Sequence, residues 1–367
     1  MRRQRGFTLL ELLAAAALFS VLGVLLFQMV RSAMDVWSTG ERNRELSDRA
    51  NAAFELLAAD LRDGWAGSAG AGVPAALLCT WRPEDDDRDG EADRRRPLLR
   101  FTRLCHEQST LEWLARAGDT AGGQDSVTGL APRDPSGLRP TGGLAESLYT
   151  LASRKDAPLP ALMRAVRMPA GGERSLLDPS LAEQKDRLLA DAVPAADDVL
   201  FFGVQFWGPG TTGWDAGGGA FTAWDSTRGL IPPGDPDFPF GVGPASWTDS
   251  SDDIWPRLVR LTLVLDRAQG AASAGSLAEP VGPEAKVITV ADGGFLRDEE
   301  APDHVLIDDE WLQVTGIDGR TLQVQRGARG TVPAVHVDGA RVRTGRTFRR
   351  VLALQAGRQL LVDGGTR

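Results

Sequence analysis

The sequence predicts an α+β protein with one long N-terminal helix and an antiparallel β domain. An apolar run from Phe7 to Val30 is followed by helical periodicity as far as Asp63. After Gly64 the chain changes to short β-type segments separated by glycine, proline and aspartate. Further short strands within residues 268–346 predict a small β module inserted before the final strand of the domain.

The apolar run is long enough to cross a membrane. Its 24 residues, at a rise of about 1.5 Å each, extend roughly 36 Å, whereas the hydrocarbon core of a bilayer is about 30 Å thick. Arginines precede the run, which predicts a cytoplasmic N-terminus and places everything after Val30 across the membrane. Arg31 disfavours an ordinary secretory cleavage site at the end of the run. We therefore expect a single-pass anchor with its soluble part in the periplasm.

One acidic residue, Glu11, interrupts the apolar run near its start. A carboxylate in lipid costs on the order of 3 kcal/mol at the bilayer centre, so it usually has a partner. The residues around it resemble the class III signal of type IV pilins and type II secretion pseudopilins: a basic leader that ends in Gly6, followed by Phe-Thr-Leu-Leu-Glu-Leu-Leu. The resemblance implies that residues 1–6 are a leader removed by a prepilin peptidase and that Phe7 becomes the N-methylated terminus. It also implies that Glu11 meets the N-terminus of a neighbouring subunit. A plain signal anchor would explain neither Gly6 nor Glu11.

The second half of the predicted helix, residues 31–64, is amphipathic. Apolar residues recur at steps of three and four, and charged residues occupy the other faces. Gly64 is suited to the position just after the helix. The predicted core-facing residues are Leu46, Ala50, Phe54, Leu57 and Leu61.

Residues 65–267 are expected to form the main β domain, which residues 347–367 complete with a final strand and a tail. One short helix is predicted from Ser180 to Ala192, with Ser180 as its N-cap. The predicted strands are Ala75 to Trp81, Leu98 to Leu104, Thr110 to Arg116, Glu146 to Ser153, Leu159 to Arg167, Val199 to Trp207, Arg257 to Asp266 and Thr347 to Gln355.

Several of these segments resemble the minor pseudopilin of type II secretion that is usually lettered J. They include the helix end from Ala50 to Arg62, the strand that contains Leu148 to Leu151, and the segment from Trp255 to Leu263. The resemblance implies a pilin-like fold, in which the N-terminal helix packs on an antiparallel sheet.

The stretch from Gly208 to Trp255 is rich in glycine, proline and aspartate and has four tryptophans. It is too long for an ordinary connection between strands. Two interpretations stay open: a surface excursion that pins its tryptophans on the β domain, or an exposed surface that binds a partner.

The inserted module is expected after an Ala-rich linker, Ala268 to Ala278. Its sequence resembles a small β module of phage-tail and other surface proteins, with the pattern Asp-Glu, Val-x-Arg-Gly, Gly-Thr, His and Gly. The resemblance implies that the glycines and His336 belong to turns and the core rather than to a catalytic site. The function of the module stays open.

Composition sets the class of partner. Hydrophobic residues make up 42% of the 367 residues, enough for a substantial core, and the formal net charge is −9. Removal of a leader with three arginines would leave −12, and an acidic exterior disfavours nucleic-acid binding. Cys79 and Cys105 would lie in an oxidising compartment, so they form either a disulfide or two separate buried thiols.

Metal and catalytic signals are weak. Asp85, Asp87 and Asp89 have the spacing of the first ligands of an EF-hand loop, but Arg96 occupies the position of the bidentate glutamate. An acidic loop neutralised by the arginines from Arg94 to Arg96 is the ordinary interpretation. The three histidines are scattered, and the usual catalytic motifs are missing, so we expect neither enzyme activity nor a cofactor.

These observations together predict a minor pseudopilin of a type II secretion system, assembled at the tip of the pseudopilus through its N-terminal helix. The expected partners are the other pseudopilins, the prepilin peptidase and the bacterial inner membrane. Two alternatives stay open: a minor pilin of a type IV pilus, and a membrane-anchored surface protein that binds through the inserted module.

Overall fold

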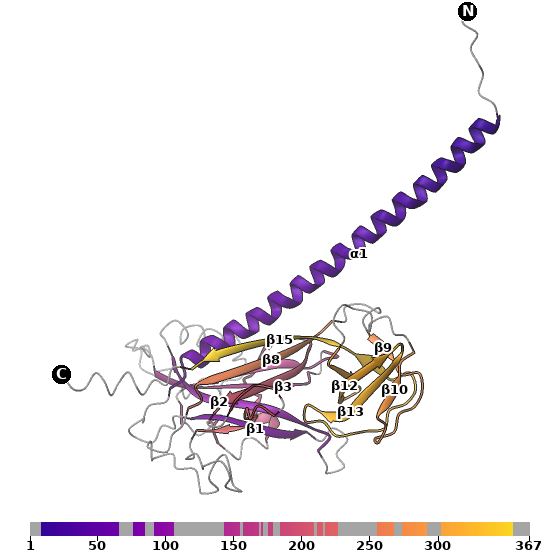
Figure 1. The fold of residues 1–367 in the computed structure, drawn as a ribbon. Helices are drawn as coiled ribbons and strands as arrows, with labels where there is room; N and C mark the ends of the chain where they lie inside the picture. Colours follow the sequence, from indigo (N-terminus) through magenta and orange to yellow (C-terminus); the bar gives the residue numbers. More distant parts are fainter. Residues whose placement is uncertain are drawn as a thin grey trace, which may run out of the picture. The chain divides into compact units, whose positions relative to one another are not determined.

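The protein has two compact units, residues 1–49 and residues 50–367. The computed structural model describes residues 9–65, 76–84, 92–105, 143–154, 157–168, 170–171, 175–178, 184–208, 211–215, 217–226, 255–267, 274–291 and 302–354. Figure 1 shows the α+β layout: one long helix, α1, and three antiparallel sheets.

Helix α1 spans Leu9–Arg62, which at about 1.5 Å per residue is roughly 80 Å. Its first half is apolar all round, and these side chains are exposed in the single chain. The helix is long and apolar enough to cross a membrane. The hydroxyl of Ser20 donates to the Ala16 carbonyl oxygen at 2.8 Å, so this polar group is satisfied within the helix.

The last turns of α1 belong to the second unit and form part of its core. Ala50, Phe54, Leu57 and Leu61 are buried, as their spacing predicts. Gly64 follows the helix, but it does not adopt the left-handed conformation expected of a helix-ending glycine. A Cβ atom there would lie 2.8 Å from the Leu61 carbonyl oxygen and 2.9 Å from the Trp255 ring, so the close approach of both is the reason for a glycine.

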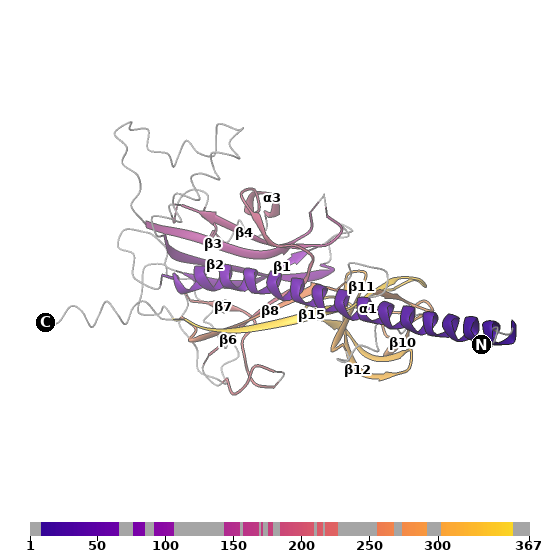
Figure 2. The ribbon, with the colours of Figure 1, turned by 90° about the horizontal axis from the view of Figure 1, so that it is seen from above.

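The body of the second unit consists of the end of α1 and two antiparallel sheets. The larger sheet has the strand order β5-β4-β3-β2-β1-β7. Strand β6 of the smaller sheet contacts β2, β3 and β4, and the last turns of α1 contact both sheets (Figure 2). The strands of the larger sheet are β1 Leu77–Glu84, β2 Arg94–Cys105, β3 Gly143–Ala152, β4 Ala161–Arg167, β5 Val193–Ala196 and β7 Trp224–Asp225.

The smaller sheet joins distant parts of the chain in the order β15-β8-β6. Its central strand β8, Leu258–Asp266, pairs with β6, Val199–Trp207, on one edge and with β15, Gly345–Ala353, on the other. The chain between β8 and β15 leaves the body and returns to it. Gly345 begins the return, where a Cβ atom would lie 2.2 Å from a methyl group of Val264.

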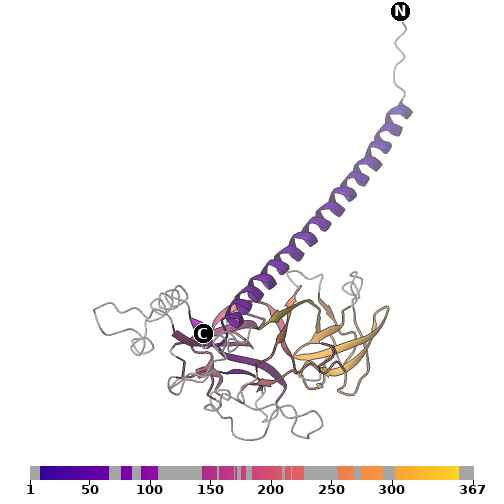
Figure 3. The same ribbon diagram turned by 60° about the vertical axis from the view of Figure 1, so that its left-hand side comes forward.

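The chain between β8 and β15 forms the module, which is coloured orange to yellow in Figure 3. Its sheet has the order β10-β13-β12-β11-β14-β9, and the module has an apolar core of its own. Strand β9 begins at Ala274, within the segment predicted to be a linker. The module strands are β9 Ala274–Ser276, β10 Val287–Thr289, β11 His304–Ile307, β12 Glu310–Asp318, β13 Thr321–Ala328 and β14 Arg341–Arg343.

The other predicted elements are partly confirmed. Seven of the eight predicted strands are present, with ends shifted by a few residues, and Thr110 to Arg116 lies outside the described residues. The helix predicted from Ser180 is only four residues long where it is described, α3 at Lys185–Leu188. Trp224 is buried against Phe206, as a surface excursion that pins its tryptophans requires.

Candidate functional site

The three residues predicted for processing and assembly lie at the start of the chain. Gly6 and Phe7 fall outside the described residues, and Glu11 lies in the first turns of α1 with its side chain outside the description. The part of this site that the structure describes is therefore the backbone and the apolar side chains of α1. Its apolar residues are exposed over every face, from Leu9 at 81% to Trp37 at 76%. A helix that is apolar all round is stable only in lipid or against other apolar helices.

A buried cluster of charged groups attaches the end of α1 to the larger sheet. Arg164 on β4 holds the Asp60 carboxylate with two bonds, from Nε to Oδ2 at 2.7 Å and from Nη2 to Oδ1 at 2.9 Å. The Tyr149 hydroxyl donates to the same carboxylate at 2.6 Å, and Arg103 Nε lies 3.6 Å from Oδ1. Burial raises the pKa of Tyr149 well above its usual value, so it stays a neutral donor. Burial opposes the charge on Arg164, but the hydrogen bonds and the charge interactions with Asp60 and Tyr149 together outweigh it and raise the pKa of Arg164.

The structure does not form the candidate disulfide. Cys79 on β1 is opposite Leu99 on β2, whereas Cys105 is six residues further along β2, opposite Gly143. At about 3.4 Å per residue the two cysteines are about 20 Å apart, beyond the roughly 7 Å that a disulfide can bridge. Both thiols are free and buried, and burial raises the pKa of Cys79 to about 12. The thiols are core residues.

The acidic loop predicted as a weak calcium candidate, with Asp85, Asp87 and Asp89, lies outside the described residues. Two of the arginines expected to neutralise it, Arg94 and Arg96, have a buried partner within the sheet. Glu84, at the end of β1, lies 3.0 Å from Arg94 and 2.6 Å from Arg96. These arginines therefore belong to an ion cluster of the sheet. Among the described residues there is no group of three histidine, cysteine, aspartate or glutamate side chains that could hold a metal.

The sequence pattern of the module corresponds to a buried polar network around Glu310. Arg326 donates to both carboxylate oxygens of Glu310, at 2.7 and 2.6 Å, and His336 Nε2 lies 2.9 Å from Oε2. The amide of Gly327, a residue with φ of 66°, donates to Oε1 at 3.1 Å. Burial would raise the pKa of Glu310, but these hydrogen bonds lower it to about 2. His336 is 2% exposed and holds two turns together, which agrees with the predicted core role.

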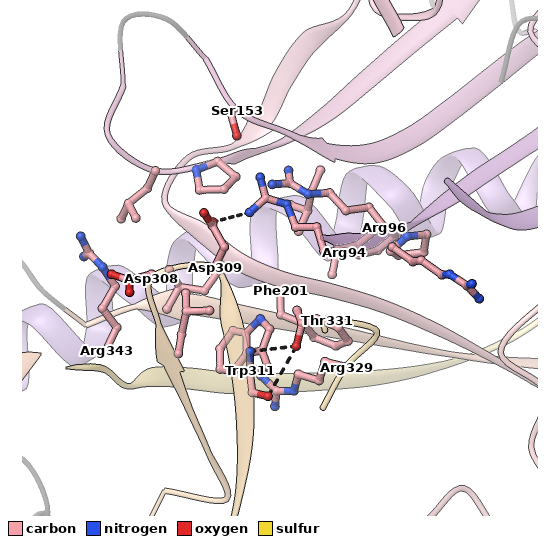
Figure 4. Close-up of a pocket in the computed structure, with 18 of the residues that line it drawn as sticks. Arg94, Arg96, Ser153, Phe201, Asp308, Asp309, Trp311, Arg329, Thr331 and Arg343 are labelled. Carbon is pink, nitrogen blue, oxygen red and sulfur yellow. Dashed lines mark hydrogen bonds and ion pairs between the residues drawn. The ribbon is translucent and has the colours of Figure 1, made fainter. Parts of the chain in front are cut away.

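A cavity of about 240 Å³ lies between the body and the module (Figure 4). Backbone bonds close it on one side, because the Arg95 amide donates to Gly330 and the Val332 amide donates to Asp93. Arg94 reaches across from β2 and pairs with Asp309, in the turn between β11 and β12. On the body side, the wall consists of residues from strands β2, β3 and β6 and from the segment just before β4. On the module side, it consists of residues from β11, β12 and β14 and from the turn after β13.

Arg329 occupies an unusual position in this wall. Its backbone is left-handed, with φ of 55°, a conformation that non-glycine residues adopt rarely. The guanidinium carbon lies 4.6 Å from the centre of the Phe201 ring and 4.3 Å from that of Trp311, and Nη2 lies 3.4 Å from Nδ1 of His304. Burial and the charge of Arg349 lower the pKa of Arg329 to about 9.

Sequence reasoning missed two of these sites. A signal for Asp60 was available, since residue 60 is three positions after Leu57 and so lies on the buried face of the helix. No local signal marks the cavity, because its wall combines residues from about 94 to 343 that only the folded chain brings together.

Residues 1–27 match the protein family described as the prokaryotic N-terminal methylation motif. The chain therefore has the N-terminal motif of type IV prepilin-like proteins, followed directly by an apolar helix, and this combination fits a membrane-anchored, single-pass protein. The match covers the start of the chain and none of the β sheets. No curated protein is significantly similar to the chain.

Proposed function

We propose that this protein is a minor pseudopilin of a type II secretion system, of the J type, which assembles at the tip of a short periplasmic pseudopilus. The observation that supports this most strongly is the methylation motif in residues 1–27, which runs directly into a helix whose apolar side chains are exposed throughout its first half. A pilin or pseudopilin needs both features, one for processing and the other for assembly.

In this proposal a prepilin peptidase cleaves between Gly6 and Phe7, and Phe7 is then N-methylated. The helix stays in the inner membrane until neighbouring pseudopilins bury its apolar surface during assembly. Glu11 then pairs with the positive N-terminus of an adjacent subunit, and because an unpaired carboxylate is costly in such surroundings, the pair fixes the register between helices.

The second unit gives the helix a rigid attachment to the β sheets. The cluster around Asp60 bonds the last turn of α1 to β3 and β4, and Glu55 pairs with Arg350 on β15 at 2.7 Å. A displacement of the helix end would have to break a buried ion pair, so force on the assembled helix would reach the β domain. We propose a structural role of this kind rather than catalysis.

Two other functions share part of this support. A minor pilin of a type IV pilus would have the same motif and helix. A membrane-anchored surface protein that binds through the module would need the helix and the module, but it would need neither cleavage nor methylation.

Mass spectrometry of the chain isolated from its native host tests processing. We expect a chain that begins at N-methylated Phe7, and we expect Gly6→Val to leave the leader attached. An intact Met1 in cells with active prepilin peptidase would exclude both the pseudopilin and the pilin, and would favour the surface protein.

Copurification tests assembly. Glu11→Ala should be processed normally but should recover much less of the partner subunits, whereas Ser20→Ala, a polar change in the same helix, should recover the normal amount. Normal recovery with Glu11→Ala would refute the charge-pairing role. The identity of the recovered subunits, pseudopilins or pilins, decides between the secretion system and the pilus.

A further inference from the structure

The cavity between the body and the module has an excess of positive charge that its own residues do not neutralise. Six arginines and two aspartates line it, which leaves four formal positive charges in a chain whose net charge is −9. Three of these arginines have carboxylate partners behind the wall: Arg94 and Arg96 pair with Glu84, and Arg343 lies 2.7 Å from Asp266. The excess therefore falls chiefly on the other arginines of the wall.

Arg329 has a hydrogen-bond donor that no acceptor in the described part of the chain satisfies. Its Nη1 atom is buried and has no hydrogen-bond partner among the described residues. The aromatic rings of Phe201 and Trp311 hold the guanidinium in place but accept none of its in-plane hydrogen bonds. A buried donor without an acceptor costs free energy that an incoming acceptor would recover.

Most of the rest of the wall is apolar. Half of its twenty residues are leucine, proline, phenylalanine or tryptophan, among them Leu159, Leu306 and Trp311. A volume of 240 Å³ is below the usual range of about 300–1,000 Å³ for sites of drug-sized ligands, so it suits a group of the size of one amino-acid residue. Inorganic anions would satisfy the arginines but would leave these apolar residues in contact with water.

We propose that this cavity binds a carboxylate attached to a small branched apolar group, the chemistry of a C-terminal leucine or valine or of a free short branched acid. The carboxylate would accept hydrogen bonds from Arg329 and Arg341, because a planar guanidinium matches a carboxylate in geometry as well as charge. The apolar group would lie against the leucines, prolines and Trp311. This site does not depend on the proposed assembly of the helix.

Isothermal titration calorimetry on the full chain in detergent, in a buffer without carboxylates or phosphate, tests the proposal. The probes are N-acetyl-glycyl-leucine, its C-terminal amide, isovalerate and inorganic phosphate. We expect the acid to bind at least tenfold more tightly than the amide, which has the same apolar group without the charge, and more tightly than phosphate. Tighter binding of N-acetyl-glycyl-leucine than of isovalerate identifies a polypeptide terminus as the source, and the reverse identifies a free acid.

Charge variants locate the site. Arg329→Met and Arg341→Met should each weaken binding of the acid by about tenfold or more, since each removes a charge-assisted hydrogen bond. Arg341 is exposed, so its variant should fold even if Arg329→Met does not. Arg320→Met, in an exposed turn of the same module that does not line the cavity, is the matched control and should bind as the natural chain does. Equal binding of acid and amide, no binding of the acid, or unchanged binding in Arg341→Met would overturn the proposal.

Discussion

Replacement of Asp60 by alanine should release the end of α1 from the β sheets. The Asp60 side chain is 5% exposed and that of Arg164 is 13% exposed, so the pair is largely shielded from water. The substitution removes two bonds from Arg164 and one from Tyr149 and leaves a guanidinium and a phenol buried without their acceptor. Because an uncompensated buried charge dominates the cost, we expect a loss of about 3–5 kcal/mol in the free energy of unfolding.

Chemical denaturation of the full chain in detergent, followed by tryptophan fluorescence, measures this loss. Asp60→Asn keeps the shape and one acceptor, so it should lose less than Asp60→Ala. Glu55→Ala is the matched control, because its side chain is 62% exposed and it pairs with Arg350 on the surface; it should cost less than about 1 kcal/mol. If Asp60→Ala costs no more than Glu55→Ala, the buried cluster does not hold the helix end, and the proposed rigid attachment is wrong.

Three other predictions concern the rest of the second unit. Because the pKa of Glu310 is lowered from 4.5 to about 2, its ionised carboxylate stabilises the fold fully above pH 4.5, and this stabilisation is lost as the pH falls toward about 2. The free energy of unfolding, measured as the pH is lowered, should therefore fall by about 3 kcal/mol, a loss that Glu310→Gln does not show. Cys79 and Cys105 should both be modified by iodoacetamide after denaturation without reductant, and a mass 2 Da below that of the reduced chain would indicate a disulfide instead. Gly345→Ala should lower the free energy of unfolding by about 1–3 kcal/mol because its Cβ would overlap Val264, whereas Gly282→Ala has open space and should be neutral; equal stability of the two variants would refute the steric argument.

Local sequence patterns were sufficient to predict features that depend on a single helix or strand. The step of three and four residues identified the face of α1 that Ala50, Phe54, Leu57 and Leu61 bury. Short apolar runs between turn residues located the body strands, because the turn residues that bound a strand are themselves a local signal. Of the helix predicted from Ser180 to Ala192, the part at Lys185–Leu188 is confirmed, and the described residues 189–192 are not helical.

Relations between distant residues could not be predicted in this way. The cysteines were compatible with a disulfide until the register of β1 and β2 separated them by six residues of strand. Arg94 was expected to neutralise a neighbouring acidic loop, which lies outside the described residues, and no local pattern indicated its pairs with Glu84 and with Asp309, more than 200 residues away. Which charges pair is decided by strand register and by burial, and neither is a local property.

The sequence by itself thus determined the long apolar helix, its prepilin-like start and the α+β class, because these depend on composition and on the period of apolar residues along one segment. The tertiary structure alone decided the anchoring of the helix through Asp60 and the basic cavity between the body and the module. Both arise where a charged group is buried beside residues from other elements, and the free energy of such a group depends on partners that only the folded chain supplies.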